Sequence, residues 1–534
     1  MKKIIMFWIG LTTILTLAWC GMQSMNRENM WSTSMDHWMM NKSNNTSTSI
    51  LQSDNDTMLA QASKVIILKD GDIYDMTVTK VLKEIGNATI PMLAYNGSIP
   101  WPLLKIEKWA TVTLRFTNKV KEIETLLHSH GVRVDNTMDG VARSMWWHQD
   151  PVKYWETFEY KLTFPDEGIF RYHPHVQEEL QQELWLYGNY LVSNSSQNKI
   201  PVNKEEALIL DDILLENDKV PAFLQDWVNY SLMGRYGNIM LINGTTNYNL
   251  TLKQWEVVRL YLTNVSNTRP YNITIPWAKI KLVWGDIGYY EHETMIDNLI
   301  IWPAERYIVD VLIDKAWSYN ITNQTPEKST ILWTIQVSND NIADSFTQEF
   351  NILQSYNEVI TDMSAYKTLI DAPIQKSLNM TIDMMGMNMW WMQHGWHGSK
   401  QQVTPIERED NNMMNANSNG SMTKWKLIDT QTKKENMDIN WLFNKWDKVK
   451  IRITNDANSM HPMQHPIHFH GQRFLVVSKN WAEQINLVWK DTALIPAWEY
   501  VDIILDASNP GTWMSHCHIA EHLSAGMMMK FEVK

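Results

Sequence analysis

Polar and apolar residues alternate along three similar segments of the chain. The segments span residues 108–118, 254–264 and 445–455, and in each an apolar residue recurs at every second position before a closing Thr-Asn. Successive side chains of a β-strand point to opposite faces, so this period predicts a strand with one buried face. The recurrence predicts three copies of one β-domain, and strands bounded by turns favour an all-β fold of β-sandwiches.

Tryptophan occupies the turn that opens each of these strands. Such turns usually carry glycine, because the backbone needs a positive φ there. Here the residue is Trp109, Trp255 or Trp446, in a chain with 27 tryptophans and 21 glycines. We hypothesise that many of these tryptophans are glycine in the native protein, because its gene uses UGA for glycine and the codon has been read as tryptophan. The alternative is a genuinely tryptophan-rich surface, which would favour aggregation. The hypothesis also covers Trp19, Trp101, Trp155, Trp185 and Trp498.

The N-terminal sequence predicts export. Two lysines precede an apolar run of about signal-peptide length, which is shorter than a stable membrane span requires. We expect a signal peptide over residues 1–19 and a periplasmic or cell-surface protein. Cys20 follows Leu-Ala-Trp, which resembles the lipobox of bacterial lipoproteins, so Cys20 is a candidate for lipidation and membrane anchoring. Residues 20–60, rich in Met, Asn, Ser and Thr, are expected to form a disordered tether.

Charge and cysteine content narrow the possible partners. A net charge of −12 argues against nucleic-acid binding, for which a basic patch would be expected. The two cysteines are Cys20 and Cys517, and the second lies among histidines. No disulfide is therefore expected.

The strongest chemical signal is His516-Cys517-His518, followed by His522 and Met527. On a strand, Cys517 faces one way and its two neighbours the other. A thiolate, two imidazoles and a weak thioether are the ligands of a blue-copper electron-transfer site. Cys517, His522 and Met527 supply three of these, so another imidazole is expected from elsewhere in the chain. The flanking histidines would serve a different metal centre.

Three further histidine pairs lie upstream. A single His-x-His is usually an accident of the surface or the core, whereas four pairs, one of them enclosing a lone cysteine, indicate metal binding. The upstream pairs are His128 and His130, His173 and His175, and His468 and His470, the last preceded by His465.

The four motifs, in this order, resemble the copper-binding motifs of the multicopper oxidases, the family of laccases, bilirubin oxidases and copper-tolerance oxidases. The resemblance covers the chain from about Lys64 to its C-terminus. It implies three cupredoxin-like Greek-key β-sandwich domains and four copper ions. The implied ligands are His465, Cys517, His522 and Met527 for type 1 copper, His128 and His468 for type 2 copper, and His130, His173, His175, His470, His516 and His518 for the type 3 pair.

The repeats and motifs set the expected domain boundaries. The first two histidine motifs fall in the first domain and the last two in the third, so the copper cluster is expected between these domains. The second domain carries no ligand motif and is expected to act as a spacer. The expected segments are domain 1 over 61–200, domain 2 over 201–350, a linker over 351–375, and domain 3 over 376–534 with a Met-rich insert over 380–422.

The Met-rich insert is a candidate docking site for cuprous ions. Thioethers are soft ligands that favour Cu(I). The alternative is flexible packing, since methionine fills irregular gaps. The candidate docking residues are Met384, Met385, Met387, Met389, Met392, His394 and His397.

The resemblance implies one-electron oxidation of Cu(I) or phenolic donors, coupled to reduction of O₂ to water, with Fe(II) as a further candidate donor. Electrons are expected to enter through an exposed edge of His465 or His522. Asp139 matches the family's proton-delivering aspartate, although a turn residue before Gly140 is the alternative. A copper-sequestering protein with little turnover is the second hypothesis, which the Met-rich segments also suit.

Several relatives carry an acidic residue just after the last type 1 histidine. Leu523 stands there in this chain, so another group must help to deliver protons. Glu521, Glu178 and Glu179 are the weaker candidates, and surface charge is the simpler interpretation of the last two.

Overall fold

The computed structural model describes residues 46–47, 49–53, 56–145, 148–194, 200–224, 227–326, 328–340, 342–384, 412–461, 463–480 and 482–534. The chain divides into two compact units, Met1–Thr46 and Ser47–Lys534. The expected signal peptide, Cys20 and most of the expected tether lie outside the described residues. Across the described ranges, no helix is both long and apolar enough to cross a membrane.

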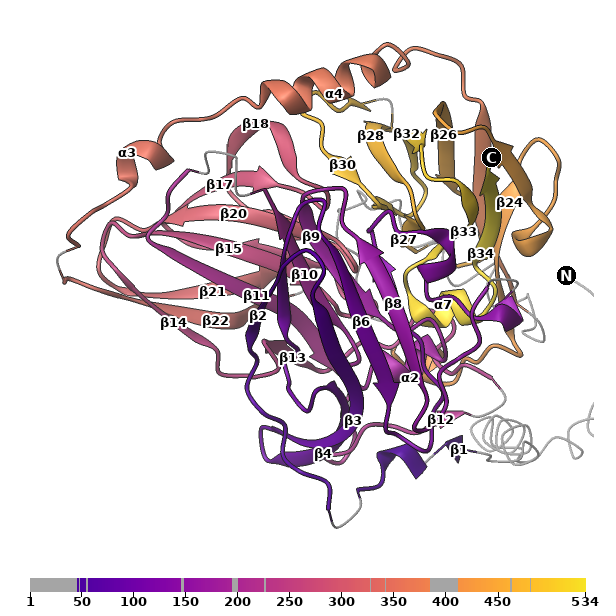
Figure 1. The fold of residues 1–534 in the computed structure, drawn as a ribbon, viewed down its shortest axis with the longest axis horizontal. Helices are drawn as coiled ribbons and strands as arrows, with labels where there is room; N and C mark the ends of the chain where they lie inside the picture. The colour runs from indigo at the N-terminus through magenta and orange to yellow at the C-terminus, as the bar shows by residue number, and fades with distance from the viewer. Residues whose placement is uncertain are drawn as a thin grey trace, which may run out of the picture. The chain divides into compact units, whose positions relative to one another are not determined.

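Strands dominate the described residues, which confirms the all-β prediction (Figure 1). The first domain has a four-stranded sheet, in the order β4-β3-β6-β8, and a five-stranded sheet, in the order β2-β5-β10-β9-β7. Its repeated segment forms β6, in which Val112, Leu114 and Phe116 are buried, as the alternation predicts. The elements up to the end of this domain are β1 (Thr46–Ser47), η1 (Ser49–Leu51), β2 (Val65–Leu68), β3 (Ile73–Ile85), β4 (Ala88–Tyr95), β5 (Leu103–Glu107), β6 (Thr111–Asn118), β7 (His128–His130), η2 (Asn136–Met138), η3 (Arg143–Met145), β8 (Thr157–Thr163), β9 (Gly168–His173), α2 (Glu178–Gln181) and β10 (Gly188–Ser193).

The second domain repeats this plan with a six-stranded sheet, β13-β11-β15-β20-β17-β18, and a five-stranded sheet, β14-β22-β21-β16-β19. Its repeated segment forms β15, which pairs with β20 on one side and β11 on the other. The strands are β11 (Lys204–Ile213), β12 (Phe223–Leu224), β13 (Ile239–Ile242), β14 (Asn249–Lys253), β15 (Val257–Asn264), β16 (Tyr271–Thr274), β17 (Lys279–Trp284), β18 (Tyr289–Ile296), β19 (Leu299–Ile301), β20 (Arg306–Leu312), β21 (Ser318–Gln324) and β22 (Ser329–Ser338).

The third domain has a seven-stranded sheet built on β24-β23-β26-β32-β28-β29, with β30 also paired to β28, and a five-stranded sheet, β25-β34-β33-β27-β31. Both remaining histidine motifs lie in the second of these sheets, on β27 and β33. The elements are β23 (Lys376–Met384), α6 (Asn412–Ala416), β24 (Thr423–Asp429), η4 (Asn436–Asp438), β25 (Asn440–Phe443), β26 (Asp447–Asn455), β27 (His465–Phe469), β28 (Arg473–Lys479), β29 (Ala482–Glu483), β30 (Trp489–Lys490), β31 (Thr492–Ile495), β32 (Tyr500–Ala507), β33 (Gly511–Cys517), α7 (Ala520–Ser524) and β34 (Met528–Val533).

The first and third domains share part of their core. The cluster of buried side chains that fills the first domain continues into Leu475, Val477 and Ile504 of the third domain's larger sheet. Burial of apolar surface is the main force that holds such an interface together. The two domains that carry the histidine motifs are therefore packed directly against each other.

Two helices, α3 (Thr347–Phe350) and α4 (Asn357–Lys367), connect the second domain to the third. Met363 and Tyr366 of α4 are buried against the core of the first domain. The indole of Trp489 donates a hydrogen bond to Asp362 at 2.7 Å, which ties α4 to the third domain. The segment expected to be a linker thus contains the helix α4, which is packed through Met363 and Tyr366, while most of its other residues are exposed or half-buried.

Six exposed turn tryptophans have a left-handed backbone, with φ between 61° and 75°. Bulky L-residues rarely adopt this conformation, because Cβ crowds the carbonyl oxygen. Three of them, Trp109, Trp255 and Trp446, open β6, β15 and β26 at equivalent places in the three domains. The structure therefore gives these turns the conformation that glycine adopts without strain. The other three are Trp155, Trp277 and Trp498.

Two other tryptophans that the glycine hypothesis covers, Trp185 and Trp101, are buried instead of exposed. Trp185 also has a positive φ, 75°, but its side chain is buried and its indole N–H has no hydrogen-bond partner among the described residues. Trp101 is buried against Tyr187 and is not among the residues with positive φ, so the turn argument does not apply to it. Trp19 lies outside the described residues.

Candidate metal centres

A cysteine and two histidines of the third domain meet at one buried point. Cys517 ends β33, His465 begins β27, and His522 lies on α7. The Cys517 sulfur is 3.6 Å from Nδ1 of His465 and 3.6 Å from Nδ1 of His522, and the two nitrogens are 3.2 Å apart. All three side chains are buried. Three potential ligand atoms thus face one small space.

Met527 is tied to this centre through the backbone. Its N–H donates to the His522 carbonyl at 2.9 Å, and its carbonyl accepts from the Cys517 N–H at 3.0 Å. Its side chain is fully buried in the third-domain core. The short helix α7 therefore folds the chain back so that Cys517, His522 and Met527 lie together.

Trp425 of β24 covers both imidazoles, which corrects the expectation of an exposed histidine edge. Its ring centroid lies 4.7 Å from that of His465 and 4.3 Å from that of His522. Its indole N–H donates to the Ser231 carbonyl of the second domain at 2.8 Å. The exposed fractions of His465 and His522 are 1% and 0%. The cover comes from a distant strand, so no spacing around the histidines could have indicated it.

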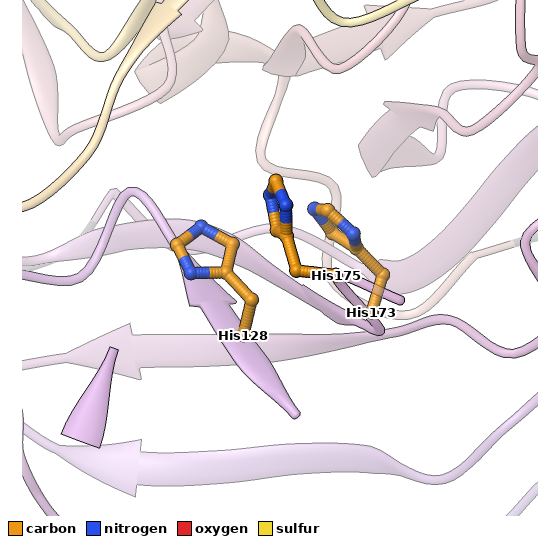
Figure 2. Close-up of side chains that lie close together, drawn as sticks. All are labelled: His128, His173 and His175. Atoms are coloured by element: carbon orange, nitrogen blue, oxygen red, sulfur yellow. The ribbon is translucent and has the colours of Figure 1, made fainter. Parts of the chain in front are cut away.

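Eight histidines of the first and third domains converge on a second buried point. In the antiparallel pair β7–β9, His128 lies opposite His173, and in β27–β33, His468 lies opposite His516. Figure 2 shows the rings of His128 on β7, His173 at the end of β9 and His175 just beyond it, all turned to the same side. Because β33 alternates, His516 faces this cluster while Cys517 faces the first centre. The remaining members of the cluster are His130, His470 and His518.

The rings of the two domains interleave. His130 stacks on His468 with centroids 3.7 Å apart, and His128 stacks on His470 at 4.0 Å. Six of the eight rings form two triples, and each triple brings three nitrogens within 4.8 Å of one another. The triples are His130, His173 and His518, and His175, His470 and His516.

Several rings are oriented by a hydrogen bond from Nδ1 to a backbone carbonyl. His128 donates to Asp139 at 2.7 Å, His468 to Asp491 at 2.8 Å, and His516 to the carbonyl of Cys517 at 2.8 Å. A carbonyl oxygen can only accept, so Nδ1 carries the hydrogen and Nε2 keeps its lone pair. This is how proteins usually orient metal-binding histidines.

The other nitrogens are bare and point inward. Nε2 of His128, His173 and His468 is buried and has no hydrogen-bond partner in the part of the chain that the structure describes. Nε2 of His470 and Nε2 of His516 face each other at 3.1 Å, although Nδ1 of each already donates elsewhere. Two facing lone pairs repel unless a cation lies between them. The donor set therefore fits metal ions.

Two family models described as multicopper oxidase match the chain, one over residues 77–197 and the other over residues 402–534. The matched ranges contain both halves of the histidine cluster. The chain belongs to the multicopper oxidase family. It is an oxidoreductase that uses O₂, and its three β-sandwich domains are cupredoxin-like.

Individual multicopper oxidases are similar over most of the chain. Multicopper oxidase mco of Staphylococcus haemolyticus is 25% identical over 450 residues, which cover 83% of each chain. Laccase-2 of Botryotinia fuckeliana is 23% identical over 531 residues, which cover 86% of this chain and 84% of the laccase. A solved multicopper oxidase from Campylobacter jejuni shares the fold with a TM-score of 0.65 at 22% identity, over 91% of this chain and 100% of its own.

Copper is the cofactor that the multicopper oxidase family implies, and the side chains of both centres suit it. The first centre offers a cysteine sulfur and two imidazoles, with Met527 hydrogen-bonded through its backbone to Cys517 and His522, and the second offers imidazoles alone. Burial raises the pKa of the Cys517 thiol, and a bound copper ion would favour its thiolate.

Asp139 joins the two halves of the histidine cluster in this multicopper oxidase. Its Oδ2 accepts from Nδ1 of His470 at 3.0 Å, and its backbone carbonyl accepts from His128. The next residue, Gly140, has φ +74°, and a Cβ there would lie 2.1 Å from the Leu127 carbonyl oxygen. Because glycine has no Cβ, the turn can pack closely against Leu127, the residue before His128. Asp139 thus lies in a tight turn and also contacts the histidine cluster.

Asp491 also contacts the histidine cluster, and no pattern in the sequence indicated it. Its Oδ1 accepts from Nε2 of His130 at 2.9 Å, which leaves Nδ1 as the bare nitrogen of that ring. It belongs to no recognisable motif and lies 21 residues after His470. Only the pairing of β27 with β31 brings it beneath the histidines.

The three glutamates considered in place of Leu523 lie in different surroundings. Glu178 is buried with Oε1 2.5 Å from Nδ1 of His175, and burial raises its pKa to about 7. Glu179 accepts from the Ser524 hydroxyl at 2.9 Å. Glu521 accepts from Asn267 of the second domain, and burial raises its pKa to about 7. Glu178 alone of these contacts a cluster histidine.

Most of the candidate Cu(I)-docking residues lie outside the described residues: Met385, Met387, Met389, Met392, His394 and His397. Met384 is the last residue of β23 and packs, partly buried, against the third-domain core. Met380, four residues earlier, is fully buried in that core. The described part of the insert therefore begins as a core strand.

The copper-free protein is expected to lose stability as the pH falls from about 6.5 toward 3. Burial lowers the pKa of His465 and of His516 to about 3, whereas histidines of the unfolded chain titrate near 6.5. Below that pH the unfolded chain takes up protons that the folded chain refuses, so each such histidine costs up to about 1.4 kcal/mol per pH unit.

Thermal unfolding followed by circular dichroism at pH 7, 6 and 5 measures this loss. The copper-loaded protein should show at least as steep a pH dependence, because its copper-bound nitrogens stay unprotonated while the unfolded chain still takes up protons. An unfolding temperature of the copper-free protein that does not change between pH 7 and pH 5 would contradict the prediction.

Proposed function

We propose that this protein is an exported multicopper oxidase that couples four one-electron oxidations to reduction of O₂ to water with four copper ions. The observation that carries the proposal is the position of Cys517. It lies in the Cys–His–His centre, and its chain neighbours His516 and His518 lie in the histidine cluster. Bound copper would supply one-electron redox chemistry at both ends of this tripeptide.

The proposed ligand assignment is the one that the family resemblance implies, and two of the buried histidine triples are compatible with it. Each His triple would hold one copper of the type 3 pair, and the remaining two cluster histidines would hold type 2 copper. The proposed ligands are His465, Cys517, His522 and Met527 for type 1, His128 and His468 for type 2, and His130, His173, His175, His470, His516 and His518 for type 3.

We propose Cu(I) as the leading donor, with phenols and Fe(II) as alternatives. Trp425 covers His465 and His522, so a bulky aromatic donor has no direct access to either imidazole. A small ion, delivered by soft thioethers of the Met-rich insert, meets this constraint better than a bulky phenol. The laccase relative keeps phenols among the donors to be tested.

Oxygen uptake by copper-loaded protein tests the proposal. Cu(I), a methoxyphenol and Fe(II) would be supplied separately, with copper-free protein as the control. The oxidase predicts one O₂ consumed for every four Cu(I) ions oxidised, and faster uptake with Cu(I) than with the phenol. Tight Cu(I) binding without oxygen uptake would instead establish the copper-sequestering function.

Asp139→Asn is expected to slow turnover about 100-fold while copper stays bound, because an amide cannot deliver a proton from that position. Asp135→Asn is the matched control. Asp135 lies on the same loop and only caps η2, where its Oδ1 accepts from the Thr137 N–H at 2.9 Å. Oxygen uptake and copper content would be measured together. Unchanged turnover in Asp139→Asn would assign Asp139 to the turn alone.

We also propose that the protein is exported through residues 1–19 and anchored by a lipid on Cys20. The lysines, the apolar run and the cysteine that follows support this. Expression of Cys20→Ser beside the unaltered chain, followed by membrane fractionation and mass spectrometry of the N-terminus, tests it. Equal membrane association of both proteins would contradict the lipid anchor.

A further inference from the structure

The second domain contributes no histidine to the cluster, yet it places one buried arginine beside it. Arg306 is the first residue of β20 and is fully buried. Its Nη1 donates to Oδ1 of Asp491 at 2.8 Å, and its Nη2 donates to Oδ2 at 2.5 Å. A two-point contact of this kind fixes both the position and the rotation of a carboxylate.

Asp491, which belongs to the third domain, touches one histidine of the first domain and one of the third. Its Oδ1 accepts from Nε2 of His130, and its backbone carbonyl accepts from Nδ1 of His468, at 2.9 and 2.8 Å. These two rings stack on each other with centroids 3.7 Å apart. A displacement of Asp491 would therefore move both rings and their bare nitrogens.

Arg306 is itself held by two domains. Asp286 accepts from the Arg306 backbone N–H at 2.7 Å and lies 3.4 Å from Nη1. Nε donates to the Ile169 carbonyl of the first domain at 2.7 Å. The Thr492 hydroxyl also donates to Oδ1 of Asp491 at 2.9 Å, so the carboxylate is held by a further neighbour. A rigidly held carboxylate is a suitable partner for the His130 N–H.

The glycine after the first histidine motif leaves room for this ion pair. A Cβ on Gly131 would lie 2.3 Å from Oδ2 of Asp491 and 3.0 Å from Nη2 of Arg306. Any other residue at this position would push the carboxylate or the guanidinium out of place. The backbone beside His130 is thus shaped to admit a side chain from the second domain.

We propose that Arg306 is a positioning residue for the copper cluster: it holds Asp491, and through it His130 and His468, in the geometry that binds copper. The inference rests on the proposed copper ligands and extends them to the second domain. In this proposal the second domain is more than a spacer, because its Arg306 helps to orient the copper ligands. All three domains meet at this one guanidinium.

Arg306→Met and Arg306→Lys test the proposal, with Arg259→Met and Arg259→Lys as matched controls. Arg259 makes the same two-point contact, with Asp310 at 2.7 and 2.9 Å, but within the second domain between β15 and β20. Copper affinity of the cluster would be measured by chelator competition. Type 2 copper would be followed by its electron paramagnetic resonance spectrum, and type 1 copper by visible absorption.

We expect both Arg306 variants to bind cluster copper about 10-fold or more weakly, with an altered type 2 spectrum and unchanged type 1 absorption. Both Arg259 variants should lose thermal stability while their cluster copper stays as in the unaltered protein.

If Arg306→Met does not fold, Arg306→Lys carries the test, because an amine keeps the charge but cannot make the two-point contact. Unchanged copper affinity and spectrum in a folded Arg306 variant would overturn the proposal, as would equal losses in the Arg259 variants. Absence of type 2 and type 3 signals from the unaltered protein would overturn the ligand assignment itself.

Discussion

Replacing Cys517 with serine is expected to abolish the blue colour and oxygen uptake together. The colour of such a site comes from a thiolate bound to copper, and a hydroxyl cannot replace that ligand. Cys517 also provides the covalent connection between the first centre and the histidine cluster. The variant would be loaded with copper, and its visible absorption and oxygen uptake with Cu(I) would be compared with those of the unaltered protein.

Met514→Leu is the matched control for this substitution. Met514 is fully buried three residues earlier on β33, in a small apolar cluster with Val141 and Leu523. A volume-conserving change there should leave colour and turnover intact. Retained blue colour in Cys517→Ser would refute the assignment of this sulfur as a type 1 ligand.

Replacing the six exposed turn tryptophans with glycine is expected to raise the free energy of unfolding by about 4 kcal/mol in total. Relief of the left-handed strain gains about 1–2 kcal/mol per position, and the larger conformational freedom of unfolded glycine offsets part of it. The positions are far apart, so their effects should nearly add. Urea titration measures the gain, and light scattering should show less aggregation. The six are Trp109, Trp155, Trp255, Trp277, Trp446 and Trp498.

Trp513→Gly is the control in the opposite direction. Trp513 is fully buried, and its indole N–H donates to the Asn509 carbonyl at 3.0 Å. Its loss should cost about 3–5 kcal/mol. A loss of stability on replacing Trp109 would contradict the strain argument. Mass spectrometry of the protein from its natural source decides the codon hypothesis separately: an intact tryptophan mass in the peptide across Trp109 would refute it there.

The fold class and the grouping of the site could be read from local patterns. Strand alternation depends on neighbouring residues alone, so β6, β15 and β26 were predictable from the sequence. The face to which each histidine of β33 points follows from the same period of two. The turn argument likewise anticipated the backbone of Trp109, Trp255 and Trp446, because a tight turn before a strand restricts φ locally.

The side chains that support the site could not be predicted in this way. Trp425, Asp491 and Arg306 carry no motif. Trp425 and Arg306 reach their partners through packing between elements that are distant in sequence, and Asp491 does so through the pairing of β27 with β31 and through the contact with the first domain. The cover over His465 and His522 is the clearest case, since Trp425 lies 40 residues before His465 and is anchored on another domain. Trp277, which lies in the turn before β17, was not among the positions that the hypothesis named.

The histidine cluster draws half of its rings from the start of the chain and half from its last part, with the whole second domain between them. A ribosome therefore releases His128, His130, His173 and His175 well before their partners exist. The last β-strand, β34, begins directly after Met527 and pairs with β33, so a chain shortened by that strand would lose the support of both centres. The complete set of ligand atoms therefore exists only after the third domain has been synthesised and packed against the first. Until then, each half of the cluster has histidine nitrogens without their full set of partners.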